Sequence, residues 1–346
     1  MGFPIWQELT PGQRQTYQHT VAIYQDYLQA LIDSRVFLGG MHWKKIRGRD
    51  YLYRYRDRLG HGESLGPRSE ETERLFTDFT RERREATARL QQERRRLQEQ
   101  ARFCRAARLP RLPKTAAKIL GRLAQHPAGS NLLVLGGTAI FAYEYAAGVM
   151  PAPSRAPELL GASLHRLLLA GSGEVTWENL LEVLRRTDRS FEPLPEGQCR
   201  AVNREGFQVQ LLKSGIRPPG KQKTVTVPGA GAPLPPEAGN LQYLLASPKF
   251  SQITIGPEGR PVTLTAPDPR AFAFNKLWLS QQEGREEGKR RRDYRQALAV
   301  ADLVLRYLPQ YEYFSTELDM LPQDLVQSAA RFAEGLEAAG EEDGNF

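Results

Sequence analysis

The stretch "LLVLGGTAIFAYEYAAG", from Leu132 to Gly148, constrains the fold more than any other part of the chain. Four apolar residues lead into Gly136 and Gly137, and a run of small and apolar residues follows. This order predicts a buried strand, a glycine turn and a helix, the unit from which α/β folds are built. Backbone N–H groups at such a helix start can hold a phosphate, but the same unit is also an ordinary way to reverse the chain.

The turn carries neither of the better-defined phosphate-binding motifs. The chain contains no GxxxxGK[ST] P-loop and no GxGxxG dinucleotide fingerprint. What remains is a short strand that ends in Gly136, Gly137 and Thr138 at the start of a helix, where N–H groups and the helix dipole favour an anion. We take these three residues as candidate phosphate-binding residues, on a signal of low specificity.

The composition limits the classes of protein that fit. A chain of 346 residues is long enough for two domains, or for one large domain with an extension, and its 40% hydrophobic content allows a substantial core. Cys104 and Cys199 lie in no CxxC or Cys/His cluster, which argues against a disulfide scaffold and a structural zinc site and indicates a reducing cytosol. The N-terminus shows no signal-peptide pattern, and no apolar run approaches the ~20 residues that span a bilayer. We therefore expect a cytoplasmic protein without a membrane partner.

A β-hairpin is predicted in the first hundred residues. The segment "MHWKKIRGRDYLYRYRDR" alternates like paired strands and has a plausible tight turn at Arg47 and Gly48. Alternation places Tyr51, Tyr53 and Tyr55 on one face and arginines on the other. We interpret the tyrosines as core residues, and stacking on nucleic-acid bases is the alternative.

A long, strongly basic helix is predicted to follow the hairpin. Ser69 is its candidate N-cap, and the helical pattern runs to about Ala107. Between Arg81 and Arg108 the chain has ten arginines and four glutamates, and the whole chain has a net charge of +8. Such a cluster can meet nucleic acid, nucleotide phosphates or an acidic protein, and it can equally be a solvated helix face. The candidate nucleic-acid contacts are Arg54, Arg56, Arg94, Arg95 and Arg96.

The second half of the chain predicts mixed structure. The segment "RAVNREGFQVQLLK" predicts two short strands around Glu205 and Gly206, and "FSQITIGPEGRPVTLTAPDPR" predicts a hairpin that turns at residues 257–259. From Asp268 onward the pattern is helical, with a final helix after Pro322.

Several blocks occur over residues 35–310 in an order typical of one family: "GGMHWKKIRGRDYLYR", "SLGPRSEETE", "LGGTAIFAYEYAAGV", "DRSF", "RAVNREGFQVQLL", "ASPKFSQITIGPEGRPVTLTAPDPRAFAFNKLWLS" and "KRRRDYRQALAVADLV". On these blocks the chain resembles a bacterial family of nucleotidyltransferase-fold proteins, related to the minimal nucleotidyltransferases. The resemblance implies an α/β (α+β) fold, in which a small mixed β-sheet is flanked by helices and further helices are added at both ends.

The prolines of "RLPRLPK", Pro110 and Pro113, break the long helix and mark a boundary. We divide the chain into an N-terminal helical region with the hairpin and the long basic helix, a nucleotidyltransferase-fold core, a C-terminal helical region and a disordered tail. The respective ranges are 1–112, 113–265, 266–338 and 339–346.

The resemblance also implies a catalytic metal site. In such enzymes a glycine turn precedes a strand with Asp-x-Asp, and a third acid lies on a neighbouring strand, because two Mg²⁺ must bridge the triphosphate and the attacking hydroxyl. In this chain "LLGASLHRLLLAG" and "VQLL" stand at these places, with Ser163, His165 and Gln210 instead of acids. We therefore expect no catalytic residue, metal ligand or cofactor, and Mg²⁺ only if substitute carboxylates such as Glu144 or Glu158 sustain activity.

The basic residues that bind nucleotide phosphates in related enzymes have counterparts in this sequence. In related enzymes a helix Lys and a later basic helix with an Asp reach the nucleotide phosphates, and Lys276 in "AFAFNKLWLS" and the "KRRRD" block with Asp293 match this layout. We take Lys276, Arg291 and Arg292 as candidate phosphate contacts. Lys276 can instead snorkel along its apolar neighbours, and the two arginines can be solvated or paired with nearby carboxylates.

Three functions are compatible with these patterns, and whether the chain is an enzyme is left open. The first is a pseudoenzyme, a catalytically impaired nucleotidyltransferase-fold protein that binds nucleotide or nucleic acid, DNA or RNA, through a basic cleft. The second is an active nucleotidyltransferase that moves NMP from NTP to a hydroxyl of a nucleic acid or protein. The third is a non-catalytic interaction module that meets a protein partner through the long basic helix. The missing acids favour the first.

Overall fold

The computed structural model of the chain describes residues 6–57, 61–109, 111–126, 129, 132–152, 156–171, 175–194, 199–213, 241–313 and 318. The helix predicted after Pro322 and the tail predicted for residues 339–346 lie outside them. The described part combines helices with several small sheets, which confirms the predicted α/β class. No helix within it is both long enough and apolar enough to cross a membrane.

The chain forms two compact units. The first contains residues 1–14, 110–258 and 262–346, and the second contains residues 15–109 and 259–261. The division into four segments that the sequence suggests stays a prediction.

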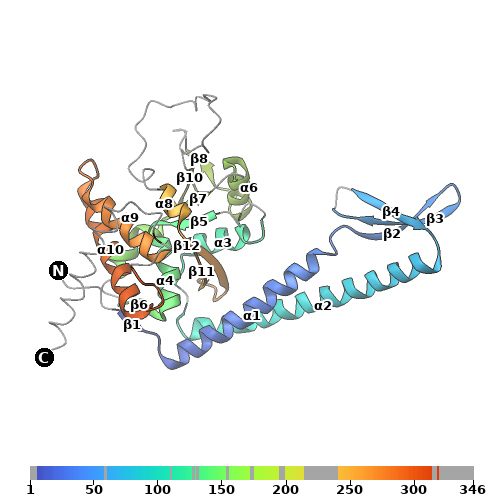
Figure 1. Ribbon diagram of the computed structural model, residues 1–346, viewed down its shortest axis with the longest axis horizontal. Helices are drawn as coiled ribbons and strands as arrows, with labels where there is room; N and C mark the ends of the chain where they lie inside the picture. The colour runs from blue at the N-terminus through green and yellow to red at the C-terminus, as the bar shows by residue number, and fades with distance from the viewer. Residues whose placement is uncertain are drawn as a thin grey trace. The chain divides into compact units, whose positions relative to one another are not determined.

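A five-stranded mixed sheet lies in the first unit, with the strand order β5–β7–β10–β9–β8 (Figure 1). β7 and β10 are parallel, and the other neighbouring pairs are antiparallel. This is the small mixed sheet that was predicted. Its strands are β5 (Leu132–Leu135), β7 (Arg166–Gly171), β8 (Glu192–Pro193), β9 (Arg200–Val202) and β10 (Gln208–Lys213).

Helices surround this sheet and share its apolar core. α9 is buried on nearly all sides, because it packs along α10 and carries an apolar run around Phe272 and Phe274. Two small ladders complete the unit, one formed by β1 (Trp6–Glu8) and β6 (Val149–Pro151), and one by β11 (Lys249–Ile255) and β12 (Pro261–Pro267). The helices are α3 (Lys114–Leu123), α4 (Ile140–Ala147), α5 (Ala156–Leu160), α6 (Trp177–Thr187), α8 (Leu241–Ala246), α9 (Pro269–Gln281) and α10 (Glu287–Tyr307).

Two long helices and a small sheet make up the second unit. α1 (Pro11–Arg35) runs beside α2 (Glu70–Ala106), and Gln100 Nε2 donates a hydrogen bond to Thr20 Oγ1 across them at 2.9 Å. The sheet contains β2 (Gly40–Ile46), β3 (Arg49–Tyr55) and β4 (Gly62–Pro67), all antiparallel. The predicted hairpin is confirmed, since β2 and β3 are joined through Arg47 and Gly48, both with positive φ.

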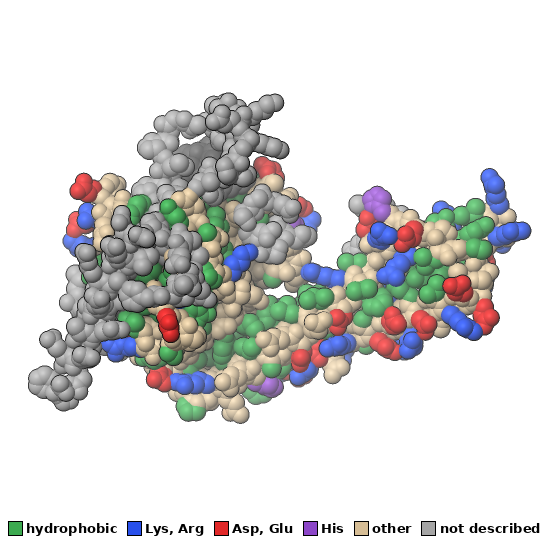
Figure 2. All heavy atoms as spheres, viewed as in Figure 1, with side chains coloured by type: hydrophobic (Ala, Val, Ile, Leu, Met, Phe, Trp, Pro, Cys, Tyr) green, Lys and Arg blue, Asp and Glu red, His purple; other side chains and the backbone are tan. Residues whose placement is uncertain are grey.

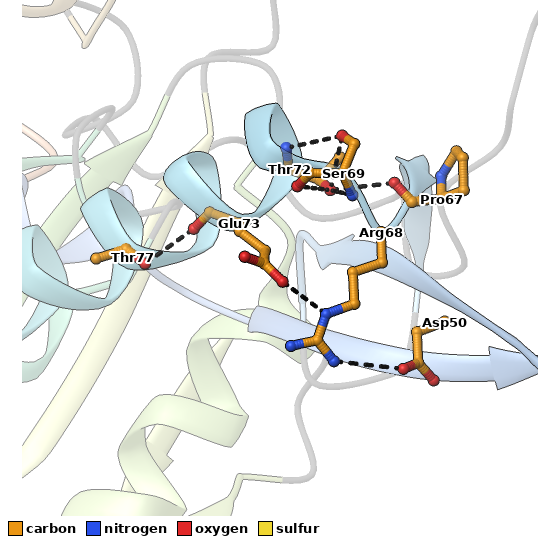
Figure 3. A network of polar contacts seen from close by, with 7 residues as sticks. All are labelled: Asp50, Pro67, Arg68, Ser69, Thr72, Glu73 and Thr77. Carbon is orange, nitrogen blue, oxygen red and sulfur yellow. Dashed lines mark hydrogen bonds and ion pairs between the residues drawn. The ribbon is translucent and has the colours of Figure 1, made fainter.

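The start of α2 is held by the cap that the sequence predicts (Figure 3). Ser69 N donates to Thr72 Oγ1 at 2.8 Å, and Thr72 N donates to Ser69 Oγ at 3.3 Å, which satisfies N–H groups that the helix itself leaves unpaired. Arg68 lies between Glu73, at 2.7 Å, and Asp50, at 3.5 Å, and so links the helix to β3. These exposed ion pairs contribute little energy but orient the helix start.

The prediction that the tyrosines of β3 pack into a core is wrong. The opposite face is buried: Leu52 is 0% exposed and clusters with Met41 and Phe79 of α2, whereas Tyr51, Tyr53 and Tyr55 are half-buried. The physical reason is that α2 presents aromatic residues to the Leu52 face. Tyrosine tolerates a water-facing position because its ring carries a hydroxyl.

A carboxyl group is buried in α4 without a hydrogen bond. Glu144 is 1% exposed, and its nearest charge is Arg111 Nε at 3.7 Å from Oε2. Burial raises the pKa of Glu144 from 4.5 to about 8, and Arg111 lowers it only in part.

We expect Glu144 to make the protein lose stability as the pH rises. With its pKa raised in the folded state, Glu144 keeps a proton that the unfolded chain has released above pH 4.5, so stability falls as the pH approaches about 8. The fall is on the order of 5 kcal/mol for a shift of this size. Melting temperatures measured from pH 5 to 8 should decline for the native protein and stay nearly level for Glu144→Gln. An equal decline in the native protein and in Glu144→Gln would contradict this prediction. Glu178→Gln, which removes an exposed carboxylate, serves as the matched control.

Candidate functional site

The glycine turn after β5 is shaped by two different constraints. Gly136 has a φ of +65°, a left-handed conformation that is costly for residues with a side chain. A Cβ on Gly137 would collide with Ser163 Oγ and would lie 2.8 Å from Gln296 Nε2. The first glycine therefore permits the turn, and the second permits the close approach of α10 and the segment before β7.

A cavity of about 90 Å³ opens beside this turn. The end of β5, the strands β7 and β10, and the helices α8, α9 and α10 contribute to it. Among the described residues that line it, four are cations and none is Asp or Glu. The polar lining residues are Thr138, Ser163, Arg166, Asn275, Lys276, Arg285, Arg292 and Gln296.

A buried carboxylate holds two of the four cations. Asp293 of α10 is 0% exposed, and it accepts hydrogen bonds from Lys276 Nζ at 2.7 Å and Arg285 Nε at 2.6 Å. A buried carboxylate needs such partners, because an unpaired charge there would be strongly destabilising. Asp293 therefore places two cations, one from α9 and one from the loop before α10, at the wall of the cavity.

The third cation belongs to the central strands. Arg166 of β7 lines the cavity, and its Nη2 donates a hydrogen bond to Oε1 of Gln210 on the neighbouring β10. Alternation along β7 sends Arg166 and Leu168 toward the cavity and buries Leu167 in the core. The neutral amide of Gln210 stands at one of the positions where the family resemblance places a metal-binding acid, and the guanidinium of Arg166 lies beside it.

One acceptor in the cavity wall has no partner among the described residues. Gln296 is 2% exposed, and its Nε2 donates to the carbonyl of Leu159 at 2.8 Å, while its Oε1 accepts no hydrogen bond.

The structure brings most of the predicted phosphate-binding residues together. Gly136, Gly137, Thr138, Lys276 and Arg292 all line the cavity.

Other predicted site residues lie apart from the cavity lining. Arg291 is exposed and pairs with Glu287 one turn earlier in α10. Of the two predicted acid positions before β7, Ser163 is buried against the turn, but His165 is exposed and outside the lining.

The five arginines predicted to contact nucleic acid all belong to the second unit. Arg54 lies 5.1 Å over the Phe79 ring, on the buried side of the sheet, and Arg56 pairs with Glu63 at 3.0 Å. Arg96 pairs with Glu93 at 2.7 Å. Arg94 and Arg95 are exposed on α2.

The residues of the cavity do not fit Mg²⁺. The ion requires several anionic or carbonyl oxygens, and the described lining offers guanidinium and ammonium groups instead. In the described part of the chain, no three His, Cys, Asp or Glu side chains gather closely enough to hold a metal ion. Glu144, a substitute in the active alternative, is not among the lining residues. The side chain of Glu158 lies outside the described part.

Sequence reasoning missed Arg166, Arg285 and Gln296 as site residues. Arg166 could have been found from strand alternation, since Leu167 and Leu169 belong to the core and leave Arg166 on the other face. Gln296 lies three residues after Asp293 on α10, a spacing that puts both on one helix face. Arg285 precedes α10 in a loop, so no periodicity indicated its position.

A family model described as Nucleotidyltransferase matches residues 114–319, more than half of the chain. No curated protein and no solved structure matches the chain. The matched range contains every residue that lines the cavity.

We expect Gly137→Ala to destabilise the protein by about 1–3 kcal/mol, because the added Cβ must displace Ser163 or Gln296. Gly121→Ala is the matched control. Gly121 lies within α3 with nothing within 4 Å of an added Cβ, so alanine there should add about 0.4–1 kcal/mol of stability. Urea unfolding of both variants measures the difference, and an equal effect of the two would contradict the close approach at Gly137.

Proposed function

The chain belongs to the nucleotidyltransferase family, and we propose that it binds the phosphates of a nucleotide in the cavity beside Gly136 and Gly137 without metal-dependent transfer. One observation carries the proposal: the described cavity lining has four cations and no carboxylate. An anion is the ligand that such a wall attracts.

The cations differ in how free they are to meet a ligand. Lys276 and Arg285 are anchored by Asp293, which holds them in place at the cavity wall. Arg292 is half-buried, lines the cavity and makes no ion pair with the described residues, so it is the cation best placed for a phosphate. Its planar guanidinium can bind two phosphate oxygens at once.

The size of the cavity limits what part of a nucleotide it holds. Its ~90 Å³ is well below the volume of roughly 300 Å³ or more that encloses a whole small molecule. Phosphate groups fit such a space, with the glycine turn and the start of the following helix supplying N–H donors. The sugar and base then lie outside it.

The cationic lining of the cavity is unfavourable for metal-dependent nucleotidyl transfer. Nucleotidyl transfer requires metal ions at the triphosphate, and Arg166 supplies positive charge beside Gln210, one of the positions at which the resemblance implies an acid. We therefore propose a catalytically impaired member of the family. We place it in the cytosol, on the scarcity of cysteines.

Arg292→Gln should weaken the binding of ATP about tenfold or more, because it removes a charge-assisted hydrogen bond. Arg291→Gln is the matched control, since it removes the same charge from the adjacent residue, which pairs with Glu287 outside the cavity lining. Titration calorimetry with ATP, repeated with GTP, CTP and UTP, measures both. Equal losses in the two variants would contradict binding in this cavity.

Nucleotide binding should persist when Mg²⁺ is removed with EDTA, because the cations of the wall neutralise the phosphates directly. Incubation with α-labelled NTPs, Mg²⁺ or Mn²⁺, and pooled RNA should transfer no label. Label transfer that depends on the metal would establish the active alternative and overturn the impairment.

A further inference from the structure

A second surface of the protein combines aromatic rings and positive charge. It is the side of the β2–β3–β4 sheet that faces away from the Leu52 core. We call it the tyrosine face, and it consists of His42, Lys44, Arg49, Tyr51, Tyr53 and Tyr55. The strand register puts these residues together, because Lys44 lies opposite Tyr51 and His42 lies opposite Tyr53.

The rings of the tyrosine face are arranged in a row. Tyr53 and Tyr55 have centroids 6.3 Å apart and planes inclined by 27°, and the His42 ring lies 5.9 Å from Tyr55. Lys44 Nζ lies 5.4 Å from the centre of the Tyr53 ring. The three tyrosines are half-buried, so part of each ring remains open to solvent. A cation among exposed aromatic rings forms a surface for flat, anionic partners.

The acidic side chains of the described sheet lie on its opposite face. Among the described residues of the sheet, Asp50 and Glu63 alternate with the tyrosine-face positions and lie in register with Lys45 and Arg54. Asp50 pairs with Arg68, and Glu63 pairs with Arg56.

The segment as a whole is basic. Between Gly40 and Pro67 the sequence has seven Lys and Arg residues and three Asp and Glu residues. Figure 2 shows Lys and Arg side chains beside hydrophobic ones, a class that in this figure includes tyrosine, in the region of this sheet.

We propose that the tyrosine face binds single-stranded nucleic acid. Unpaired bases stack on the tyrosine rings, and Lys44 and Arg49 neutralise the phosphates between them. Alternate residues of a strand lie about 6.6 Å apart, so successive rings can each receive a base. A duplex hides its base faces within its own stack and would leave the rings unused.

The sequence favoured core packing for these tyrosines and left base stacking as the alternative. Their position on the open face favours that alternative. The predicted contacts Arg54 and Arg56 are replaced by Lys44 and Arg49, because Arg54 lies over Phe79 on the core side and Arg56 pairs with Glu63. This surface belongs to the second unit, and the proposal does not rest on nucleotide binding in the cavity of the first unit.

Stacking is tested with the full-length protein and a labelled oligothymidylate of about 12 nucleotides, followed by fluorescence anisotropy at low salt. Tyr53→Thr and Tyr55→Thr should each weaken binding about tenfold, since threonine keeps the strand preference but removes the ring. Tyr53→Phe and Tyr55→Phe keep the ring and should bind within about twofold of the native protein. Circular dichroism confirms that each variant is folded.

The contribution of positive charge to oligonucleotide binding is tested with two adjacent lysines of β2. Lys44→Gln removes a cation from the tyrosine face, and Lys45→Gln removes the same charge from the other face of the same strand. The slope of log affinity against log salt should fall by about 0.7 for Lys44→Gln and stay unchanged for Lys45→Gln.

Three results would overturn the proposal. They are the absence of oligonucleotide binding at low salt, equal effects of Lys44→Gln and Lys45→Gln, and undiminished binding by the threonine variants, which would place the contact elsewhere, such as on α2. Arg292→Gln should bind the oligonucleotide normally. A failure of nucleotide binding in the cavity is therefore distinguishable from a failure here.

Discussion

The carboxylate of Asp293 is the interaction on which the cavity depends. It is fully buried and holds Lys276 of α9 and Arg285 of the preceding loop, so one side chain of α10 fixes cations from two other segments. Removing it would take from two buried cations the carboxylate that both contact, which costs more than the pair contributes. The arrangement therefore serves to position positive charge more than to stabilise the fold.

The neighbouring strands continue the same electrostatic pattern. Gln210 stands at one of the positions where the family resemblance implies an acid that attracts Mg²⁺, and the positively charged Arg166 donates a hydrogen bond to it. A phosphate beside the glycine turn can be neutralised by protein cations, whereas a metal ion there would be repelled by them. These two side chains therefore favour an anionic ligand over a metal ion, which supports the proposed binding of phosphate.

Tyr143 of the first unit and the tyrosines of β3 in the second unit have different surroundings. In the first, Tyr143 is fully buried and donates to the carbonyl of Pro267 at 2.9 Å, so its hydroxyl has a structural partner. In the second, the tyrosines of β3 leave their outer surface to solvent. The same residue type therefore contributes to packing at Tyr143 and to an open surface on β3, while Tyr17 and Tyr24 of α1 are buried in the second unit too. Whether another element covers the tyrosine decides between the two cases.

The sequence by itself determined the local elements and the family. The cap at Ser69, the turn at Arg47 and Gly48, and the strand before Gly136 follow from short-range preferences that need no partner. The tertiary structure decided which face of each strand is covered and which side chains meet. Arg166 became a lining residue, His165 did not, and the tyrosine row turned outward, because burial depends on which distant element packs there. Alternation shows that a strand has two faces but cannot show which one α2 or α10 will occupy.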